Sequence, residues 1–279
     1  NKNVNLTAIT DFKEIVVKHF IDSVLPFNMI DIEENSSFID VGTGAGFPSI
    51  PLMIVRPDLK CTMLEALNKR CVFLEKACEL VGVKATVVHG RAEDYAKDRR
   101  ECFDFATARA VANMSVLSEY CMPYVKVGGK FIALKSVNEE IEQADDAIKI
   151  LGGKITKLII PGTYKNVDYA DGNYYGSNVL KELVLKNGVE TVTGFKGSKK
   201  LSSIQFSSTL KEIGDVAFNG CESLSAVSLP AGLKKIGQYA FADTGLLSIV
   251  LPDAIEEYGQ QAFAQCQNLT KAVLRSSST

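Results

Sequence analysis

A repeat fills the second half of the chain, and it limits the possible fold more than any other feature. Short segments beginning with leucine start 21, 23, 22 and 23 residues apart, at Leu180, Leu201, Leu224, Leu246 and Leu269. Between them an Ala-Phe pair recurs, which gives Phe218, Phe241 and Phe263 matching positions. Units this short cannot bury their apolar residues alone, so they must stack. We predict a solenoid in which each repeat adds one parallel strand to a single sheet, with the phenylalanines stacked inside.

The first half has a different sequence pattern, in which β-branched runs alternate with helical stretches. The expected strands are Ser37–Val41, Cys61–Leu64, Ala85–His89, Phe103–Ala106 and Lys130–Leu134. The expected helices between them are Pro48–Val55, Lys69–Val81, Met114–Val125 and Asn138–Leu151, and Leu6–Phe27 is expected to form a helix packed against the sheet. This alternation predicts an α/β fold with a doubly wound parallel sheet.

The boundary between the two sequence patterns falls on the segment Lys154–Gly162. This segment fits the last strand of the α/β sheet, and it also aligns with the repeats. We predict an α/β domain over residues 1–160, a linker or irregular first repeat over 161–177, and the repeat domain over 178–279.

Composition indicates the cellular compartment of the protein and bears on metal and membrane binding. The 279 residues are 46% hydrophobic with a formal net charge of −2, and no apolar run approaches the about 20 residues that span a bilayer. Seven dispersed cysteines without a CxxC pair indicate reduced thiols, and two histidines offer no metal cluster. We therefore expect a cytoplasmic protein without a metal or a membrane contact. The first residue is Asn1, which indicates a truncated or processed N-terminus.

The run FIDVGTGAGFPSIPL carries the strongest functional feature, a glycine cluster directly after an expected strand. Gly42, Gly44 and Gly46 form a GxGxG pattern, which fits either a purely structural turn or a nucleotide cradle. A dinucleotide fingerprint requires its third glycine at position 47, where this chain has Phe47. The pattern therefore disfavours a nicotinamide or flavin dinucleotide.

Acidic residues after successive strands indicate another ligand. Asp40 precedes the glycines, where it would attract an amino group and repel a pyrophosphate. Glu65 ends the second strand, where it would accept hydrogen bonds from both ribose hydroxyls. The run His89–Tyr95 follows the third strand, where an adenine edge would lie. This order of acids is the one expected for S-adenosylmethionine.

Seven motifs in order extend this interpretation to a family. They are NLTAIT (Asn5–Thr10), KHFIDS (Lys18–Ser23), DVGTGAGFPSIPL (Asp40–Leu52), NKRCVFL (Asn68–Leu74), GRAED (Gly90–Asp94), TARAVA (Thr107–Ala112) and FIALK (Phe131–Lys135). Residues 3–158 thereby resemble the glucose-inhibited division protein B family, which are small-subunit ribosomal RNA methyltransferases that form 7-methylguanine. The resemblance implies a Rossmann-like methyltransferase sheet and cofactor contacts at Gly42, Phe47, Ala92, Glu93 and Arg109. Residues 178–279 resemble bacterial surface-antigen type leucine-rich repeats.

The chemistry implied by this family needs few catalytic side chains. Nitrogen 7 of guanine carries a free lone pair, so its attack on a sulfonium methyl group requires alignment rather than a general base. Arg109 is expected to contact the cofactor carboxylate or the target nucleotide, and Lys135 either holds an RNA phosphate or is solvated. His19 either caps the pocket from the leading helix or is structural.

The chain also departs from the family. The family has a further N-terminal helical stretch, and its sheet ends in an antiparallel hairpin with a basic last strand, whereas here the repeats begin. Residues 1–158 hold 20 Lys and Arg against 22 Asp and Glu, so no basic excess compensates. Three hypotheses remain: a methyltransferase whose repeat domain binds an unknown protein partner, a binding protein with an inactive methyltransferase remnant, or a fusion without shared function. We expect S-adenosylmethionine binding with weak or absent methylation of ribosomal RNA.

Overall fold

The computed structural model describes residues 11–109, 112–134, 147–160, 166–167 and 180–274. The chain divides into two compact units, Asn1–Gly153 and Lys154–Thr279, which are described separately below.

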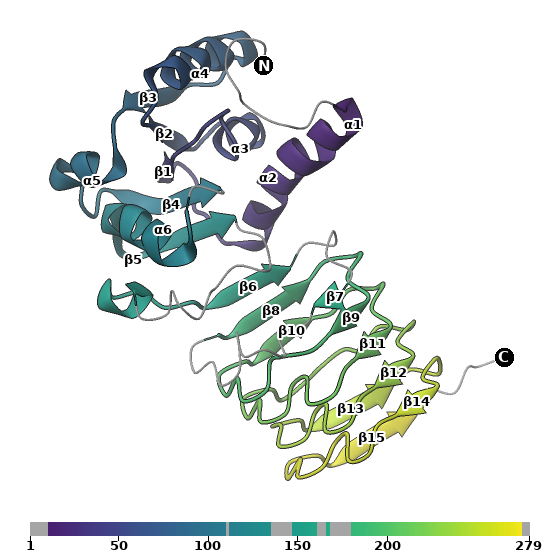
Figure 1. Cartoon of the computed structure of the whole chain (residues 1–279). Helices are drawn as coiled ribbons and strands as arrows, with labels where there is room; N and C mark the ends of the chain where they lie inside the picture. The colour runs from purple at the N-terminus through teal and green to yellow at the C-terminus, as the bar shows by residue number, and fades with distance from the viewer. Residues whose placement is uncertain (1–10, 110–111, 135–146, 161–165, 168–179, 275–279) are drawn as a thin grey trace. The chain divides into compact units, whose positions relative to one another are not determined.

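The first unit is built on a five-stranded parallel sheet, so the predicted fold class is confirmed (Figure 1). The strand order is β3-β2-β1-β4-β5. The chain runs from β1 outward to β3 and then returns to β4 on the other side of β1, so the order of the connections reverses between β1 and β4. The carboxyl ends of neighbouring strands on either side of such a reversal flank the usual ligand crevice of an open α/β sheet. The strands are β1 (Ser37–Val41), β2 (Lys60–Glu65), β3 (Ala85–His89), β4 (Phe103–Arg109) and β5 (Val125–Leu134).

Helices cover both faces of this sheet. Residues of α3 (Ser49–Val55) and α4 (Asn68–Val81) pack on one face around Phe38, and residues of α6 (Met114–Cys121) pack on the other around Ile39. Both Phe38 and Ile39 are fully buried, which explains why β1 has a continuous apolar run up to Asp40. The sheet therefore holds the residues after β1 on a rigid base.

The leading segment is more broken than the single helix we predicted. It consists of α1 (Phe12–Ile15), a π-helical turn η1 (Val16–Ile21), α2 (Asp22–Val24) and a 3-10 turn η2 (Leu25–Met29). Residues 6–10 of the prediction lie outside the described residues. Of the helix predicted over Asn138–Leu151, the described residues 147–150 are helical.

Three short helical turns were not predicted as separate elements. Two of them, α5 (Ala92–Tyr95) and η3 (Ala96–Asp98), follow β3. The third is η4 (Met122–Tyr124), which ends the helix predicted up to Val125. Such turns are shorter than the period over which apolar spacing reveals a helix.

The second unit is a solenoid of parallel strands, but the prediction of one sheet is wrong. A three-stranded sheet has the order β10-β8-β6, a five-stranded sheet has the order β14-β12-β11-β9-β7, and β13 pairs with β15. Most repeats therefore contribute a second strand of only two residues, too short to show in an alternating pattern. The strands are β6 (Lys157–Ile160), β7 (Asn166–Val167), β8 (Glu182–Leu185), β9 (Thr191–Val192), β10 (Ser203–Gln205), β11 (Glu212–Ile213), β12 (Lys235–Ile236), β13 (Ser248–Leu251), β14 (Glu257–Tyr258) and β15 (Lys271–Leu274).

One predicted repeat strand does not form. Residues 224–230 carry no strand assignment, so the sheet that contains β10 is separated from the pair β13 and β15. This turn of the solenoid still stacks on the next one, because the Leu247 N–H donates a hydrogen bond to the Ser225 carbonyl.

The observed boundary lies earlier than the one we predicted at residue 160. β6 pairs with β8 over four residues, and β7 pairs with β9, although β7 lies inside the predicted linker 161–177. Of the two alternatives for Lys154–Gly162, the pairing of β6 is that of an opening repeat. The rest of the predicted linker lies outside the described residues.

The predicted phenylalanine stack is confirmed. Ring centroids are 5.5 Å apart between Phe218 and Phe241, and 5.6 Å apart between Phe241 and Phe263. Phe195 extends the stack by one ring, 5.8 Å from Phe218, and was not predicted. Phe195, Phe218 and Phe241 are fully buried, so this column forms the centre of the solenoid core.

Backbone strain in one repeat turn leads to a stability prediction. Val216 has a φ of 50°, in the left-handed region that β-branched residues avoid. Asparagine tolerates this region better, so Val216→Asn is expected to raise the free energy of unfolding of the repeat unit by about 0.5–1 kcal/mol. Urea unfolding measures the change. As a matched control, Val192→Asn at a fully buried strand position is expected to destabilise the unit, and equal effects at both sites would contradict the explanation.

Candidate cofactor site at the sheet edge

The glycine cluster forms a tight turn between β1 and α3. The Gly42 N–H donates to the Leu64 carbonyl at 2.8 Å, and the Gly46 N–H donates to the Thr43 carbonyl at 2.9 Å. The φ angles of Gly42, Gly44 and Gly46 are 71°, 59° and 89°, all in the region that glycine enters without steric cost. The turn thus ties the end of β1 to the end of β2.

Two of these glycines have different surroundings. A Cβ added at Gly46 would lie 2.4 Å from the Ile50 Cδ1, so the turn packs directly on α3 there. A Cβ added at Gly44 would meet only the Gly42 carbonyl oxygen, at 3.8 Å. Gly46 is therefore a packing position, whereas the backbone at Gly44 leaves room for the close approach of another group.

Asp40 is completely buried beneath this turn. Its Oδ2 accepts hydrogen bonds from the Thr43 hydroxyl at 2.6 Å and the Ser49 hydroxyl at 2.5 Å. Its Oδ1 is buried without a hydrogen-bond partner among the described residues. Asp40 thus stabilises the turn through Oδ2. The ligand contact that we predicted for Asp40 stays a prediction, and Oδ1 is the oxygen that remains for it.

Burial raises the pKa of Asp40 from 3.8 to about 7, against the lowering effect of the two hydroxyl hydrogen bonds. Between these values the folded protein retains a proton that the unfolded chain has lost. The unfolding free energy of the first unit should therefore fall as pH rises from about 4 to 7, by up to ~1.4 kcal/mol per pH unit.

We expect Asp40→Asn to flatten this dependence, measured by urea unfolding at several pH values in the same window. Asp58→Asn is the control, because the pKa of Asp58 is lowered to about 2 by its hydrogen bond from Arg56 and the group stays ionised throughout. An unchanged slope in Asp40→Asn would show that another group titrates.

Glu65 at the end of β2 faces the same turn. Only 4% of its surface is exposed. Its Oε2 accepts from the Gly44 N–H at 3.0 Å, its Oε1 accepts from the Leu67 N–H at 2.9 Å, and the Arg70 guanidinium lies 3.7 Å away. The two acids singled out in the sequence are therefore brought to one glycine turn from two adjacent strands.

Arg109 at the end of β4 joins the turn to the leading helical segment. Its guanidinium donates to the Ser23 hydroxyl and to the His19 Nδ1, both at 3.1 Å. Accepting this bond requires His19 Nδ1 to be unprotonated. Burial lowers the pKa of Arg109. The arginine is thus held at the carboxyl edge by His19 and Ser23, which lie 90 and 86 positions earlier in the chain.

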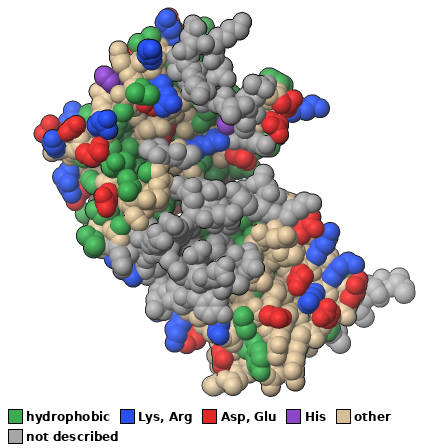
Figure 2. All heavy atoms as spheres, in the orientation of Figure 1, with side chains coloured by type: hydrophobic (Ala, Val, Ile, Leu, Met, Phe, Trp, Pro, Cys, Tyr) green, Lys and Arg blue, Asp and Glu red, His purple; other side chains and the backbone are tan. Residues whose placement is uncertain are grey.

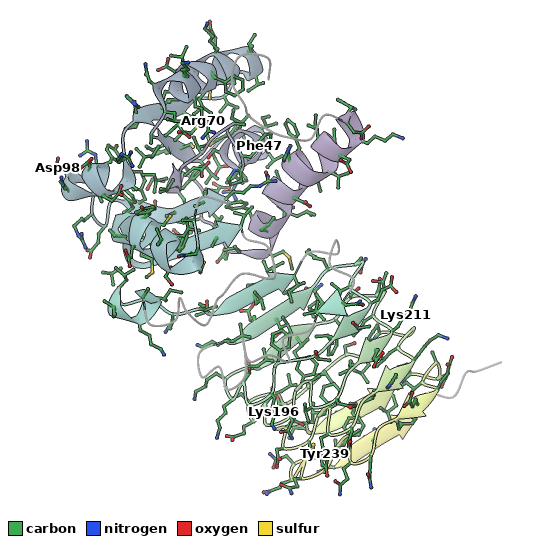
Figure 3. The ribbon with its side chains drawn as sticks, viewed as in Figure 1. Phe47, Arg70, Asp98, Lys196, Lys211 and Tyr239 are labelled. Carbon is green, nitrogen blue, oxygen red and sulfur yellow. The ribbon has the colours of Figure 1, made fainter. Side chains whose placement is uncertain are left out.

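Phe47 completes this cluster (Figure 3). The rings of Phe47 and His19 stack with centroids 5.1 Å apart, and the Arg109 guanidinium carbon lies 5.9 Å from the centre of the Phe47 ring. The structure therefore brings together His19, Phe47 and Arg109 beside the glycine turn. The sequence alone did not reveal this contact, since it depends on how the leading segment folds back.

The remaining predicted site residues are less closely connected. Ala92 opens α5 after β3, and its carbonyl accepts from the Tyr124 hydroxyl at 2.6 Å. Glu93 is exposed and interacts with Tyr120, whose pKa it raises. The topology sets both at the same sheet edge, but no hydrogen bond among the described residues joins them to the glycine turn. Lys135 lies outside the described residues.

The other features of the described residues do not indicate a second functional site. An open hollow of about 830 Å³ lies at the opposite sheet edge, against the strand starts Lys60, Cys61 and Ala85. The described residues contain no cluster of metal-ligating side chains and no helix long and apolar enough to cross a membrane.

Comparison with known proteins identifies the family. The model of the family "rRNA small subunit methyltransferase G" matches residues 1–166, more than half of the chain. The chain belongs to this family. A ribosomal RNA small subunit methyltransferase G of Clostridium beijerinckii is 58% identical over 163 residues, which cover 57% of this chain and 68% of that protein. The Clostridium perfringens protein of the same name is 52% identical over 174 residues, with 60% and 73% covered.

The second unit matches a different model. Six copies of the BspA type leucine-rich repeat cover residues 192–279. Among solved structures, a leucine-rich repeat protein of T. pallidum is 28% identical, with a TM-score of 0.36 and coverage of 43% of this chain and 53% of that one. A precorrin 8W decarboxylase of Methanobacterium thermoautotrophicum is 17% identical, with a TM-score of 0.41 and coverage of 55% and 76%. The fold assignment rests on the strand order and pairing of this chain.

Proposed function

We propose that the first unit transfers a methyl group from S-adenosylmethionine to nitrogen 7 of a guanine in small-subunit ribosomal RNA, in the cytosol. The observation that carries this proposal is membership of the methyltransferase G family, with 58% identity to one relative across the α/β unit. The clustered turn, acids and arginine at the carboxyl edge of the sheet support it.

The residues present fit S-adenosylmethionine. The open side of Gly44 allows close approach of a ligand, and each Glu65 oxygen keeps a lone pair for a ribose hydroxyl beyond its backbone bond. The unpartnered Asp40 Oδ1 offers an acceptor for an amino group. In the proposed complex, Gly42, Ala92 and Glu93 complete the contacts along the edge, and Gly46 supports the turn by packing on α3.

The protein's own residues would act by positioning. S-adenosylmethionine supplies an electrophilic methyl group when bound. Guanine nitrogen 7 needs no proton removed, so the rate depends on in-line alignment. Arg109, fixed by Ser23 and His19, would hold the cofactor carboxylate or the target nucleotide, and the half-buried Phe47 ring would limit water at the reacting centre. Lys135 would hold a phosphate of the RNA.

The residues of the first unit support cofactor binding better than they support RNA binding. β6 and β7 pair within the repeat unit, and the described residues of the α/β sheet include no antiparallel strand. Residues 1–158 carry 20 basic against 22 acidic side chains. Phosphate contacts supply much of the affinity for RNA, so we expect methylation to be slow or absent even where the cofactor binds.

A second candidate function is a solenoid that binds a protein partner and carries an inactive methyltransferase remnant. The incorporation of β6 and β7 into the repeats favours it, because these residues are then withdrawn from the α/β sheet. This candidate predicts partner capture that is unaffected by any change at Arg109.

The test is transfer of labelled methyl groups to unmodified small ribosomal subunits, with the product nucleoside identified by mass spectrometry. Arg109→Ala is expected to weaken cofactor binding by about tenfold, through loss of a charged contact. Lys135→Ala should reduce RNA affinity and leave cofactor binding intact. Arg56→Ala, which removes a surface ion pair with Asp58, is the control that should change neither. Labelling of a base atom other than guanine nitrogen 7 would contradict the proposal.

A further inference from the structure

The start of α4 departs from the usual distribution of charge along a helix. The macrodipole favours acidic side chains in the first turn and disfavours basic ones. The first turn of α4 contains Lys69 and Arg70 but no acidic residue, and its N-cap Leu67 provides no side-chain hydrogen bond. Figure 2 shows basic and acidic side chains intermixed on the visible face of this unit, so a surface field of one sign does not explain the two cations. They require a local explanation.

The two cations have different surroundings. The Arg70 Nη1 lies 3.7 Å from the Glu65 Oε2, so the arginine side chain extends from α4 toward the end of β2 (Figure 3). The Arg70 side chain is 34% exposed, whereas Lys69 is classed among the exposed residues and takes no part in this ion pair. Arg70 is therefore the cation that compensates the negative charge of Glu65.

The Glu65 carboxylate depends on this cation more than an exposed acid would. Glu65 is buried, and a buried carboxylate without a compensating charge is costly. Asp40 is the second buried acid of the same turn. The pKa of Asp40 is raised chiefly by burial, and the negative charge of Glu65 adds to that rise, so the two acids repel each other. Arg70 opposes this repulsion from the side of Glu65.

The ion pair leaves the remaining acceptor sites of Glu65 available. Each carboxylate oxygen accepts one backbone bond, from the Gly44 N–H and from the Leu67 N–H. At 3.7 Å the Arg70 nitrogen lies beyond the usual length of an N–H···O hydrogen bond, so it balances the charge without taking up a lone pair. An ionised carboxylate accepts through both oxygens, whereas a protonated one has turned one oxygen into a donor. Arg70 thus keeps Glu65 able to accept two further hydrogen bonds.

We propose that Arg70 is a positioning residue that makes the cofactor site selective for a ribose with both hydroxyl groups. The inference rests on the proposed function, in which Glu65 accepts hydrogen bonds from both ribose hydroxyls of S-adenosylmethionine. Arg70 acts through Glu65 and does not itself contact the ribose. A ligand with a deoxyribose leaves a lone pair of the buried carboxylate without a donor, so it is rejected as long as Arg70 holds that carboxylate ionised.

Calorimetric titration of the full chain with S-adenosylmethionine and with its 2′-deoxyribose analogue measures this selectivity. The unaltered chain should bind S-adenosylmethionine at least about tenfold more tightly, because the analogue loses a hydrogen bond to a charged acceptor. Arg70→Gln should lower the ratio of the two affinities to less than about threefold, by weakening S-adenosylmethionine and leaving the analogue nearly unchanged. A merely structural role of Arg70 would weaken both ligands equally and preserve the ratio.

Two further variants accompany Arg70→Gln. Lys69→Gln is the matched control, because it removes a positive charge from the same helical turn without touching the ion pair, and it should preserve the ratio. The double variant Glu65→Gln/Arg70→Gln should be no less selective than Glu65→Gln alone, since the two residues act as one unit. It also keeps the test valid if Arg70→Gln does not fold, because the double variant leaves no buried charge without its partner.

The possible failures of the two proposals are distinguishable. Three results would overturn the role of Arg70 alone: an unchanged ratio in folded Arg70→Gln, equal affinities of the unaltered chain for both ligands, or a further loss of selectivity when Arg70→Gln is added to Glu65→Gln. Absence of S-adenosylmethionine binding by the unaltered chain would contradict the proposed function and this inference with it.

Discussion

Phe241→Ala is expected to lower the free energy of unfolding of the repeat unit by about 3–5 kcal/mol. The side chain is fully buried between two other rings of the column, with centroids 5.5 Å and 5.6 Å away. Its removal leaves a cavity that neighbouring coils cannot close, because their backbones are tied together by hydrogen bonds on both sides of the stack. Urea unfolding followed by circular dichroism measures the loss.

Two further variants separate this cavity from a general effect of losing an apolar residue. Phe263→Ala removes the last ring of the column, which is partly exposed, so its cost should be smaller than that at Phe241. Leu247→Ala alters a side chain that is 55% exposed and should cost less than about 1 kcal/mol. Similar losses at all three positions would show that the ring column is not the centre of the core.

Gly44→Val is expected to reduce S-adenosylmethionine binding below detection. Gly44 has a φ of 59°, and the space beside it holds no protein atom nearer than the Gly42 oxygen at 3.8 Å from an added Cβ. A valine there would fill the room required by a closely approaching ligand, and it would displace the N–H that donates to Glu65.

Gly82→Val is the matched control for backbone strain. Gly82 ends α4 with a φ of 71°, and an added Cβ would meet no atom within 4 Å. This variant should cost about 1–2 kcal/mol of stability, as for any left-handed non-glycine residue, and keep cofactor binding. Loss of binding in both variants would mean that Gly44 acts through stability and not through contact.

Strands with strong apolar runs were predicted well from the sequence. β1 and β3 have the predicted bounds, and β2 differs by one residue at each end. All three contain β-branched or other apolar residues that favour a strand, and most of β1 and β2 is buried, whereas β3 is only partly buried. The two-residue strands of the solenoid were missed, because they are defined by stacking on neighbouring coils and not by local periodicity.

The sequence singled out residues of this site but not the contacts between them. Gly44 and Glu65 were both named from the sequence, and the structure joins them by a hydrogen bond, whereas their contacts with a cofactor stay predictions. The roles of Thr43 and Ser49 were missed, although both are hydroxyl residues close after a buried aspartate, the pattern that a buried carboxylate requires. The bond from Arg109 to His19 depends on tertiary folding of the leading segment, which no local pattern encodes.

The junction between the units shows where family likeness and structure diverge. The family model extends to residue 166, yet Lys157–Ile160 and Asn166 pair with repeat strands. The aliphatic run at Lys157–Ile160 suits either environment, since a buried parallel strand needs the same residues in both. Pairing with β8 decides its place in this chain.

Calorimetric titration of the full chain with S-adenosylmethionine tests the central claim, that the first unit holds the complete cofactor cradle of its family. The account predicts saturable binding at one site per chain, no binding of nicotinamide dinucleotides, and loss of the signal in Gly44→Val with the fold retained. Absence of S-adenosylmethionine binding by a folded chain, or equal binding of both ligand classes, would contradict it.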